Sequence, residues 1–324
     1  MTGALGFIGR ALSQRLRDEG AEVGGVDVRA EPELGVVAGD VTEPGAWQEG
    51  MRGCDVVFHT AAIVSNAVDM DGQWKVNVLG TRRAVEGAAA GGAGRFVTLS
   101  SVRAFSDNGF PDGVDESWPV RPDGNPYVDT KIASEQVVLQ AHAAGEVECT
   151  VIRPGDVYGP RSRPWTILPV EAIRAGRLIL PAGGRGVFSP VYVDNLVDGL
   201  LLAASKPEGA GEVFTVSDGV GITCAEFFAH YARMLGKPDP RGLPTPVVLA
   251  LVGAIGGVER LREGTTEMNA ATVRYLARTG TYSIAKARER LGFDPQVGLD
   301  EGMRRTQEWL RQEGMLDSPA QAGP

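Results

Sequence analysis

The sequence predicts an α/β fold in which a doubly wound parallel sheet is combined with a smaller C-terminal substrate lobe. Short apolar runs alternate with helical segments through the first half of the chain. A glycine-rich turn leads directly into a helix near the N-terminus, as in nucleotide-binding α/β proteins. Beyond about residue 160 the pattern becomes less regular and richer in Pro and Gly, which indicates a second lobe.

The expected elements alternate as such a sheet requires. Helices are expected at residues 7–19, 74–90 and 127–144. Strands are expected at residues 21–26, 35–38, 56–59, 95–99 and 148–152. We expect residues 1–160 to form mainly the sheet domain and residues 161–312 mainly the substrate lobe, with some elements exchanged, and residues 313–324 to form a flexible tail.

Composition excludes several classes of function. The 324 residues carry a net charge of −9 without any basic block, so nucleic acid is not an expected partner. The three cysteines are scattered, which predicts no disulfide framework or zinc site and a reducing cytoplasmic location. The three histidines show no metal-ligand spacing either, so we expect no metal and read His59, His142 and His230 as structural.

The longest apolar segment, at residues 247–258, is too short to span a bilayer, which takes about 20 residues. No membrane span is therefore expected. We interpret the segment as a buried helix, and an apolar lid or a contact with a membrane surface is the alternative.

The N-terminal glycines form a candidate phosphate-binding loop. Gly3, Gly6 and Gly9 follow a G-x-x-G-x-x-G pattern, and Phe7 and Ile8 begin the helix that follows. A helix start offers unpaired N–H groups and the positive end of the helix dipole, and both suit a pyrophosphate. This arrangement is typical of the Rossmann type of doubly wound sheet.

Asp27 ends the next expected strand at the spacing of a residue that holds the adenosine ribose, about 20 residues beyond the glycines. A carboxylate there repels a 2′-phosphate, so NAD is the expected cofactor and NADP is less favoured. Arg29 is a weaker argument in the other direction.

One expected strand is largely missing from the sequence. A Rossmann unit has a strand before the glycine loop, but only Met1 and Thr2 precede Gly3. Since that strand is normally central, we expect its neighbours to lack a partner, and we expect about six to eight further residues upstream in the native chain.

Tyr127 and Lys131 lie four residues apart, which places both on one face of a helix. A phenol has a pKa near 10, and a neighbouring ammonium group favours the phenolate and lowers that pKa. The pair is therefore a candidate acid/base for moving a proton on and off an alcohol oxygen. An exposed Tyr and Lys on a surface helix would be the alternative for an isolated match.

Several motifs in order extend this pattern along nearly the whole chain. After the glycine loop come Asp40-Val41, His59-Thr60-Ala61-Ala62, Asn77-Val78-Leu79-Gly80-Thr81, Leu99-Ser100-Ser101, Tyr127 to Lys131, Arg153-Pro154-Gly155-Asp156-Val157-Tyr158-Gly159-Pro160 and Tyr192-Val193-Asp194-Asn195. With these motifs the chain resembles the extended short-chain dehydrogenase/reductases of the NAD-dependent epimerase/dehydratase type.

The resemblance implies roles for individual residues. Ser101, Tyr127 and Lys131 would be catalytic, with Lys131 also on the nicotinamide ribose. Gly3, Gly6, Phe7, Ile8 and Gly9 would line the pyrophosphate, Asp27 would hold the ribose, and Asp40 and Val41 would flank the adenine. Ala61 and Ala62 would pass under the cofactor, Asn77 would support the active-site end of its helix, and Pro154, Gly155 and Val157 would pack near the nicotinamide.

Each assignment has a structural alternative. Asp40 could cap a helix, Asn77 could be an ordinary helix-surface amide, and Ser100 and Ser101 could simply end a strand.

Substrate class is suggested by two residues. Sugar-nucleotide members of the family usually carry an Arg, which contacts phosphate, at the position of Phe188, whereas Arg185 lies three residues earlier. Phe188 and the apolar segment at residues 247–258 more closely resemble the 3β-hydroxysteroid dehydrogenase-like branch, which acts on apolar alcohols. Core packing is the alternative for Phe188.

Three functions remain open at this point. The first is an NAD-dependent oxidoreductase of an apolar, steroid-like alcohol or ketone. The second is a sugar-nucleotide epimerase or dehydratase, and the third is a non-catalytic regulator that binds NAD(H). The resemblance also implies a homodimer formed through the helices at residues 74–90 and 127–144.

Overall fold

The computed structural model describes residues 1–107, 109–261 and 267–316. Its main sheet is parallel, and the strands lie in the spatial order β2 (Val36–Ala38), β1 (Gly25–Asp27), the Thr2 segment, β3 (Val56–His59), β4 (Arg95–Leu99), β5 (Cys149–Pro154) and β10 (Glu212–Val216). Val57 pairs with Phe96 and Phe96 with Cys149, so the apolar runs lie side by side in the middle of the sheet. This is the strand order of a Rossmann sheet.

Thr2 stands where the central strand was expected. It makes parallel bridges to Val26 on one side and His59 on the other. Its N–H donates to the Phe58 carbonyl oxygen at 3.0 Å, and its own carbonyl oxygen accepts from the Thr60 N–H at 3.2 Å. On the β1 side the Val26 N–H donates to the Met1 carbonyl oxygen at 2.8 Å, and the Val26 carbonyl oxygen accepts from the Ala4 N–H at 3.2 Å. The short segment from Met1 to Ala4 therefore joins β1 and β3.

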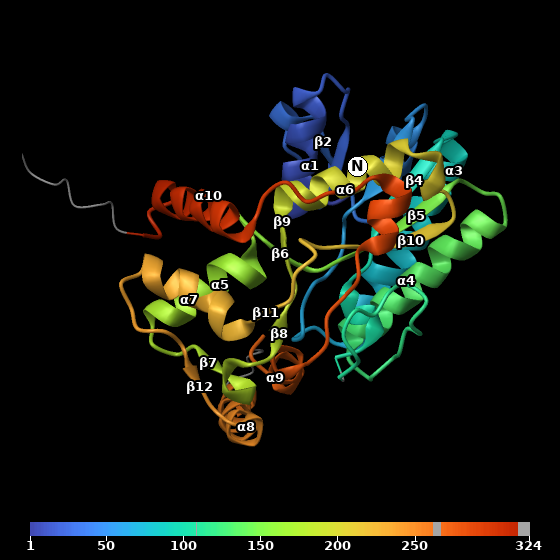
Figure 1. Cartoon of the computed structure of the whole chain (residues 1–324). Helices are drawn as coiled ribbons and strands as arrows, with labels where there is room; N and C mark the ends of the chain where they lie inside the picture. Colours follow the sequence, from blue (N-terminus) through green and yellow to red (C-terminus); the bar gives the residue numbers. More distant parts are fainter. Residues whose placement is uncertain (108, 262–266, 317–324) are drawn as a thin grey trace, which may run out of the picture.

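Helices cover both faces of the sheet, as predicted (Figure 1). On one face α1 (Phe7–Asp18) packs against α6 (Val193–Ser205), and on the other α3 (Gly80–Gly91) packs against α4 (Pro126–Ala143). A short helix α2 (Met70–Gln73) and a π-helical turn η3 (Trp74–Leu79) lead into α3. Because α6 and β10 come from beyond residue 160 yet belong to the sheet layer, elements are exchanged between the two predicted regions.

The second lobe lies to one side of the sheet (Figure 1). Its helices are α5 (Leu168–Arg174), α7 (Cys224–Met234), α8 (Thr245–Leu261), α9 (Ala270–Ala277) and α10 (Leu299–Gln312). Three pairs of short strands accompany them: β6 (Asp156–Tyr158) with β9 (Pro190–Tyr192), β7 (Ile179–Leu180) with β12 (Arg241–Gly242), and β8 (Val187–Phe188) with β11 (Ile222–Thr223). One apolar core continues from Leu12 and Val97 of the sheet domain to Phe227 and Leu310 of this lobe.

Short single-turn helices connect the larger elements. They are η1 (Pro32–Leu34), η2 (Ala46–Met51), η4 (Val102–Phe105), η5 (Arg163–Ile167), η6 (Pro181–Gly184), η7 (Pro207–Gly209) and η8 (Ala287–Leu291). Of these, η4 positions the candidate site because it directly follows β4 and Ser101.

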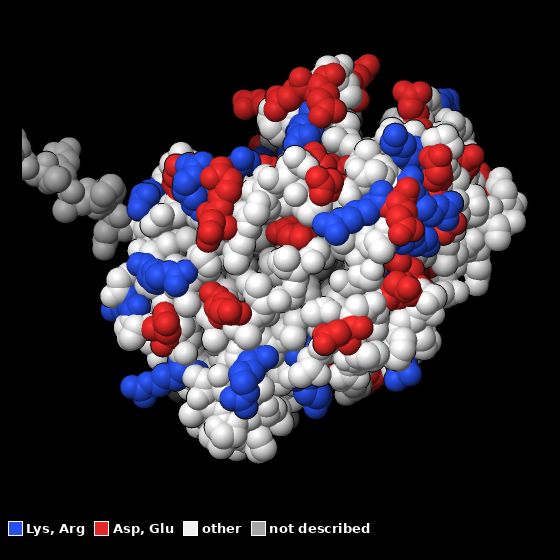
Figure 2. Space-filling view, in the orientation of Figure 1, with Lys and Arg blue, Asp and Glu red and all other residues white. Residues whose placement is uncertain are grey.

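Helix α8 differs from the buried helix that the sequence predicted. Val248 and Val252 are buried against Val273 of α9, but Leu251 and Ile255 of the same helix are 43% and 54% exposed. In Figure 2 the lower end of the molecule, where α8 lies in Figure 1, is largely uncharged. Only some of the apolar side chains of α8 are thus buried against other residues. Within the described part of the chain, no helix has both the length and the apolar character to cross a membrane.

The predicted boundary of the tail is too early. Leu316 is buried against the core, and the Met315 N–H donates to the Leu310 carbonyl oxygen at 2.8 Å. Met315 and Leu316 therefore pack against the lobe, and residues 317–324 of the predicted tail lie outside the described residues.

Candidate active site

The three predicted catalytic residues meet at the carboxyl end of the sheet. Ser101 follows β4, and its Oγ accepts a hydrogen bond from the Arg103 N–H at 3.1 Å, which caps η4. Tyr127 lies in the first turn of α4, where the Asn125 side chain accepts from the Tyr127 N–H at 2.9 Å. One turn later, the Lys131 Nζ donates to the Leu99 carbonyl oxygen at 2.8 Å. All three side chains are buried.

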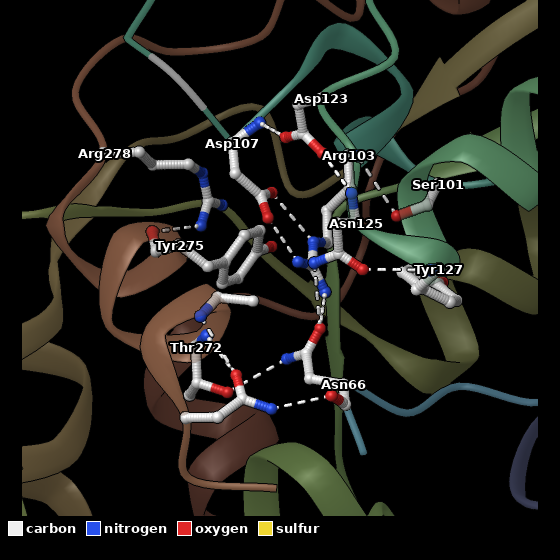
Figure 3. Close-up of polar contacts among 12 residues, drawn as sticks. Asn66, Ser101, Arg103, Asp107, Asp123, Asn125, Tyr127, Thr272, Tyr275 and Arg278 are labelled. Carbon is white, nitrogen blue, oxygen red and sulfur yellow. Dashed lines mark hydrogen bonds and ion pairs between the residues drawn. The ribbon is translucent and has the colours of Figure 1, made fainter. Parts of the chain in front are cut away.

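The Tyr127 phenol is 6% exposed, and this burial raises its pKa above the ordinary value of 10. The polar Ser101 side chain and the positive charge of Arg103 act in the opposite direction. Ser101 and Tyr127, far apart in sequence, therefore lie near each other. Figure 3 shows both residues beside Arg103.

The Lys131 ammonium group is bound to the end of β4. Burial lowers its pKa from 10.5 to about 8, against the opposing charge of Glu135. Its Nζ donates to the Leu99 carbonyl oxygen, and Arg103 is a cation that favours the Tyr127 phenolate. The expected effect of Lys131 on the pKa of Tyr127 remains a prediction. The pKa is raised because desolvation of the buried phenolate outweighs the favourable charges.

The glycine loop has the shape that a bound dinucleotide needs. Gly3 has a φ of +67°, and a Cβ on it would lie 2.6 Å from the Ala61 nitrogen. A Cβ on Gly9 would lie 2.2 Å from the Gly3 carbonyl oxygen. Gly6 is exposed at the start of α1, and no side chain caps that helix. The first N–H groups of α1, at Phe7 and Ile8, are thus left for an anionic ligand, and the loop fits a pyrophosphate.

Asp27 ends β1 beside this loop. Its carboxylate accepts from the Leu5 N–H and the Val28 N–H at 2.9 and 2.8 Å, so it already orders the glycine turn. Asp40 is exposed, and its Oδ1 accepts from the Thr42 N–H at 2.8 Å, a local turn-capping bond. Val41 is buried in the core. Their predicted contacts with ribose and adenine remain predictions.

Asn77 is a buried connector rather than a surface amide. Its Oδ1 accepts from the Ile63 N–H at 2.8 Å, and its Nδ2 donates to the Ile63 carbonyl oxygen and to Thr130 Oγ1, both at 3.1 Å. These bonds tie η3 to α4 and to the chain that follows β3, which carries Ala61 and Ala62. Asn77 is 2% exposed, and its predicted support of the active site remains a prediction.

The residues predicted near the nicotinamide line the start of β6. Pro154 ends β5 and is buried, and Val157 is buried in β6. A Cβ on Gly155 would lie 2.4 Å from the Ser189 carbonyl oxygen, so only glycine fits between these strands. Their contact with the cofactor remains a prediction.

The two predicted substrate residues, Phe188 and Arg185, differ in their exposure. Phe188 is fully buried, with its ring centroid 3.9 Å from that of Phe227 and 5.0 Å from that of Trp165. Arg185 is exposed. Phe188 is thus a core residue, which is the alternative that the sequence left open, because neighbouring aromatic rings of α7 and η5 enclose it.

A buried charged network beside Tyr127 was missed from the sequence. Arg103 is paired with Asp107, and Arg278 is paired with Asp156, while the Tyr275 ring lies between the two arginines (Figure 3). Tyr275 also donates its hydroxyl to Asp156. Arg103 and Asp107 are four residues apart, a spacing that indicates an ion pair. Nothing in the sequence pattern pointed to Tyr275 or Arg278.

His59 is structural, as predicted. Its Nδ1 lies 2.7 Å from Thr2 Oγ1 and its Nε2 lies 3.0 Å from Thr81 Oγ1. Complete burial lowers the pKa of the imidazole to about 3, and it stays neutral at physiological pH.

A glycine loop on a parallel sheet, followed by Ser101, Tyr127 and Lys131 buried at its carboxyl end, defines an extended short-chain dehydrogenase/reductase. The chain belongs to the NAD dependent epimerase/dehydratase family, whose model matches residues 1–217. This membership confirms the expected fold and NAD as the expected cofactor.

Curated relatives include enzymes of both classes that the sequence left open. The chain is 32% identical over 339 residues to the 4-hydroxy-2-methyl-3-oxo-4-farnesyl-3,4-dihydroquinoline-1-oxide ketoreductase of Stigmatella aurantiaca, with 100% of this chain and 96% of that protein covered. It is 31% identical to a UDP-glucose 4-epimerase of Mycolicibacterium smegmatis, with coverages of 96% and 97%. It is 30% identical to a 3-beta-hydroxysteroid dehydrogenase of Mycolicibacterium neoaurum, with coverages of 94% and 88%.

Among solved structures, MoeE5 in complex with UDP-glucose and NAD superposes with a TM-score of 0.77 at 26% identity. The match covers 96% of this chain and 98% of that one.

Proposed function

We propose that this chain is an NAD-dependent oxidoreductase that interconverts a secondary alcohol and a ketone on an apolar substrate. The burial of Ser101 and Tyr127 together at the end of the sheet, where Lys131 anchors the tyrosine helix to Leu99, is the observation that carries the proposal. It puts a proton donor and acceptor next to a second hydroxyl that can orient the reacting oxygen.

In the oxidation direction, the Tyr127 phenolate takes the proton from the substrate hydroxyl while Ser101 hydrogen-bonds the same oxygen. In the reduction direction, Tyr127 returns that proton to the carbonyl oxygen. Gly3, Gly6, Gly9 and Asp27 would hold the cofactor. Bound NAD supplies the hydride acceptor, and its reduced form the donor.

The charges beside Tyr127 favour an oxidoreductase over a sugar-nucleotide enzyme. A nucleotide pyrophosphate needs unpaired cations, but Arg103 and Arg278 are each already paired with a buried carboxylate. A pyrophosphate placed there would also meet Asp107 and Asp156. The farnesyl and steroid compounds named for two relatives support an apolar substrate.

The test is the absorbance of reduced nicotinamide during incubation with NAD and a panel of steroid and long-chain secondary alcohols, and with UDP-sugars. Net reduction of free NAD by an apolar alcohol, lost in Tyr127→Phe, is the expected result. A UDP-sugar epimerised without net reduction would replace the proposal with the epimerase alternative. Tight NAD binding without turnover on the whole panel would favour the non-catalytic regulator.

A further inference from the structure

Arg103 makes the closest described approach of a cation to the Tyr127 ring. Its guanidinium carbon lies 5.2 Å from the centroid of the Tyr127 ring and 4.6 Å from that of Tyr275 (Figure 3). The residue is 9% exposed, so its charge is weakly screened by water. A cation this close to a buried phenol stabilises the phenolate.

Two partners fix the guanidinium. Arg103 Nε donates to Asp107 Oδ1 at 2.8 Å, and Nη2 donates to the other carboxylate oxygen, which gives a two-pronged pair. Nη1 donates to Asn66 Oδ1 at 3.1 Å. The same Asn66 oxygen accepts from Asn125 Nδ2 at 3.2 Å, and Asn125 caps the Tyr127 N–H. Asn66 and Asn125 thus connect the Arg103 guanidinium to the backbone of Tyr127 through hydrogen bonds.

Asn66 also extends the network to the second lobe. Its Nδ2 donates to Thr272 Oγ1 at 3.0 Å, and its carbonyl oxygen accepts from Asn269 Nδ2 at 2.6 Å. Both partners belong to the start of α9. The placement of Arg103 therefore depends on how the second lobe packs against the sheet domain.

Other charged groups face Tyr127 from neighbouring elements. Asp107, which follows η4, and Asp156 of β6 both disfavour the phenolate. Asp156 is itself paired with Arg278 and bonded to Tyr275, both from the α9 region. On its own helix, the Lys131 ammonium is engaged by the Leu99 carbonyl oxygen. Arg103 is thus a cation that favours the Tyr127 phenolate, against the effects of burial and of the two carboxylates.

We propose that Arg103 is a positioning residue for Tyr127 and that its guanidinium, fixed by Asp107 and Asn66, supplies the positive charge that favours the phenolate. This inference rests on the proposed function because it assumes that Tyr127 is the acid/base. Lys131, for which the sequence predicted this electrostatic role, lies on the same helix as Tyr127 and donates to the Leu99 carbonyl oxygen of β4.

The test is a pH titration of tyrosinate absorbance in the full chain. Each variant is compared with its own Tyr127→Phe version, so that the difference reports Tyr127 alone. Arg103→Met should raise the pH of half-ionisation by about one unit, and Arg103→Lys should recover most of the shift. Asp107→Asn should lower it. Arg121→Met, which removes an exposed arginine stacked on Trp118, is the matched control and should change nothing.

An unchanged titration of Tyr127 in Arg103→Met would overturn the inference. If Arg103→Met does not fold, Asp107→Asn is measured instead. A pH of half-ionisation of Tyr127 in Asp107→Asn that equals or exceeds the parent value would also overturn the inference. Turnover is not needed for either readout. Failure to oxidise any alcohol would therefore count against the proposed function, whereas an unshifted titration in an active enzyme would count against the role of Arg103 alone.

Discussion

The Lys131 ammonium donates a hydrogen bond to the Leu99 carbonyl oxygen at 2.8 Å, and this contact ties helix α4 to the end of strand β4. Both groups are buried. Because Ser101 follows Leu99 closely and Tyr127 lies one turn before Lys131, the same contact holds the serine and the phenol together.

Tyr127→Phe should abolish turnover, with a loss of at least about 10²-fold in kcat, because the phenol is the proposed proton carrier. NAD binding should be largely retained, since the glycine loop is untouched. Steady-state kinetics and calorimetric NAD titration check both expectations. A variant with near-normal kcat would remove Tyr127 from the mechanism.

Lys131 should give stability a characteristic dependence on pH. Its pKa is lowered to about 8 in the folded chain from an ordinary 10.5, so the unfolded chain binds the extra proton between these values. Unfolding free energy of the parent should therefore rise relative to Lys131→Met as pH increases from 8 to 10.5, by up to about 3 kcal/mol. Urea unfolding across this window measures the difference. A flat difference would mean that burial does not lower the pKa of Lys131 below its value in the unfolded chain.

Gly9→Ala should weaken NAD binding by about tenfold or more and lower the Tm, because the new Cβ would lie 2.2 Å from the Gly3 carbonyl oxygen. The loop that faces the pyrophosphate must then shift. Gly50→Ala is the control, since a Cβ there meets nothing within 4 Å. Calorimetry and thermal melts measure both variants. Equal NAD affinities in the two would show that the loop tolerates the methyl group.

Phe188→Ala should cost about 3–5 kcal/mol of unfolding free energy, because the ring is fully buried against Phe227 and Trp165. The exposed Val220→Ala serves as control and should change stability by less than about 0.5 kcal/mol. Chemical denaturation gives both values. A changed substrate preference at unchanged stability would instead return Phe188 to the substrate pocket.

We propose that η3, α3 and α4 form the face of a homodimer. Trp74 and Leu79 of η3 are 41% and 42% exposed, which leaves apolar surface there for a second copy. Leu79→Glu should halve the mass measured by light scattering, whereas Val37→Glu, on exposed β2, should not. A parent chain that is monomeric at high concentration would exclude this dimer.

The fold could be predicted closely where burial and periodicity agree. Strands β3 and β4 have the expected bounds, because each is a short apolar run buried on both faces of a parallel sheet. Ser101, Tyr127 and Lys131 could be predicted because their spacing is local or belongs to an ordered set of motifs. Helix α8 could not be placed correctly, since an apolar run does not reveal how many of its faces find a partner.

The sequence by itself determined the class of sheet, the glycine loop and the serine–tyrosine–lysine set, because these depend on residue type and short spacing. Only the tertiary structure decided that Arg103 faces Tyr127, that Lys131 is bound to Leu99, and that Phe188 lies in the core. The physical reason is that burial and charge act through space. Asn66, Asp156 and Tyr275 belong to distant segments, and only their packing brings them into the low-dielectric surroundings that set the ionisation of Tyr127.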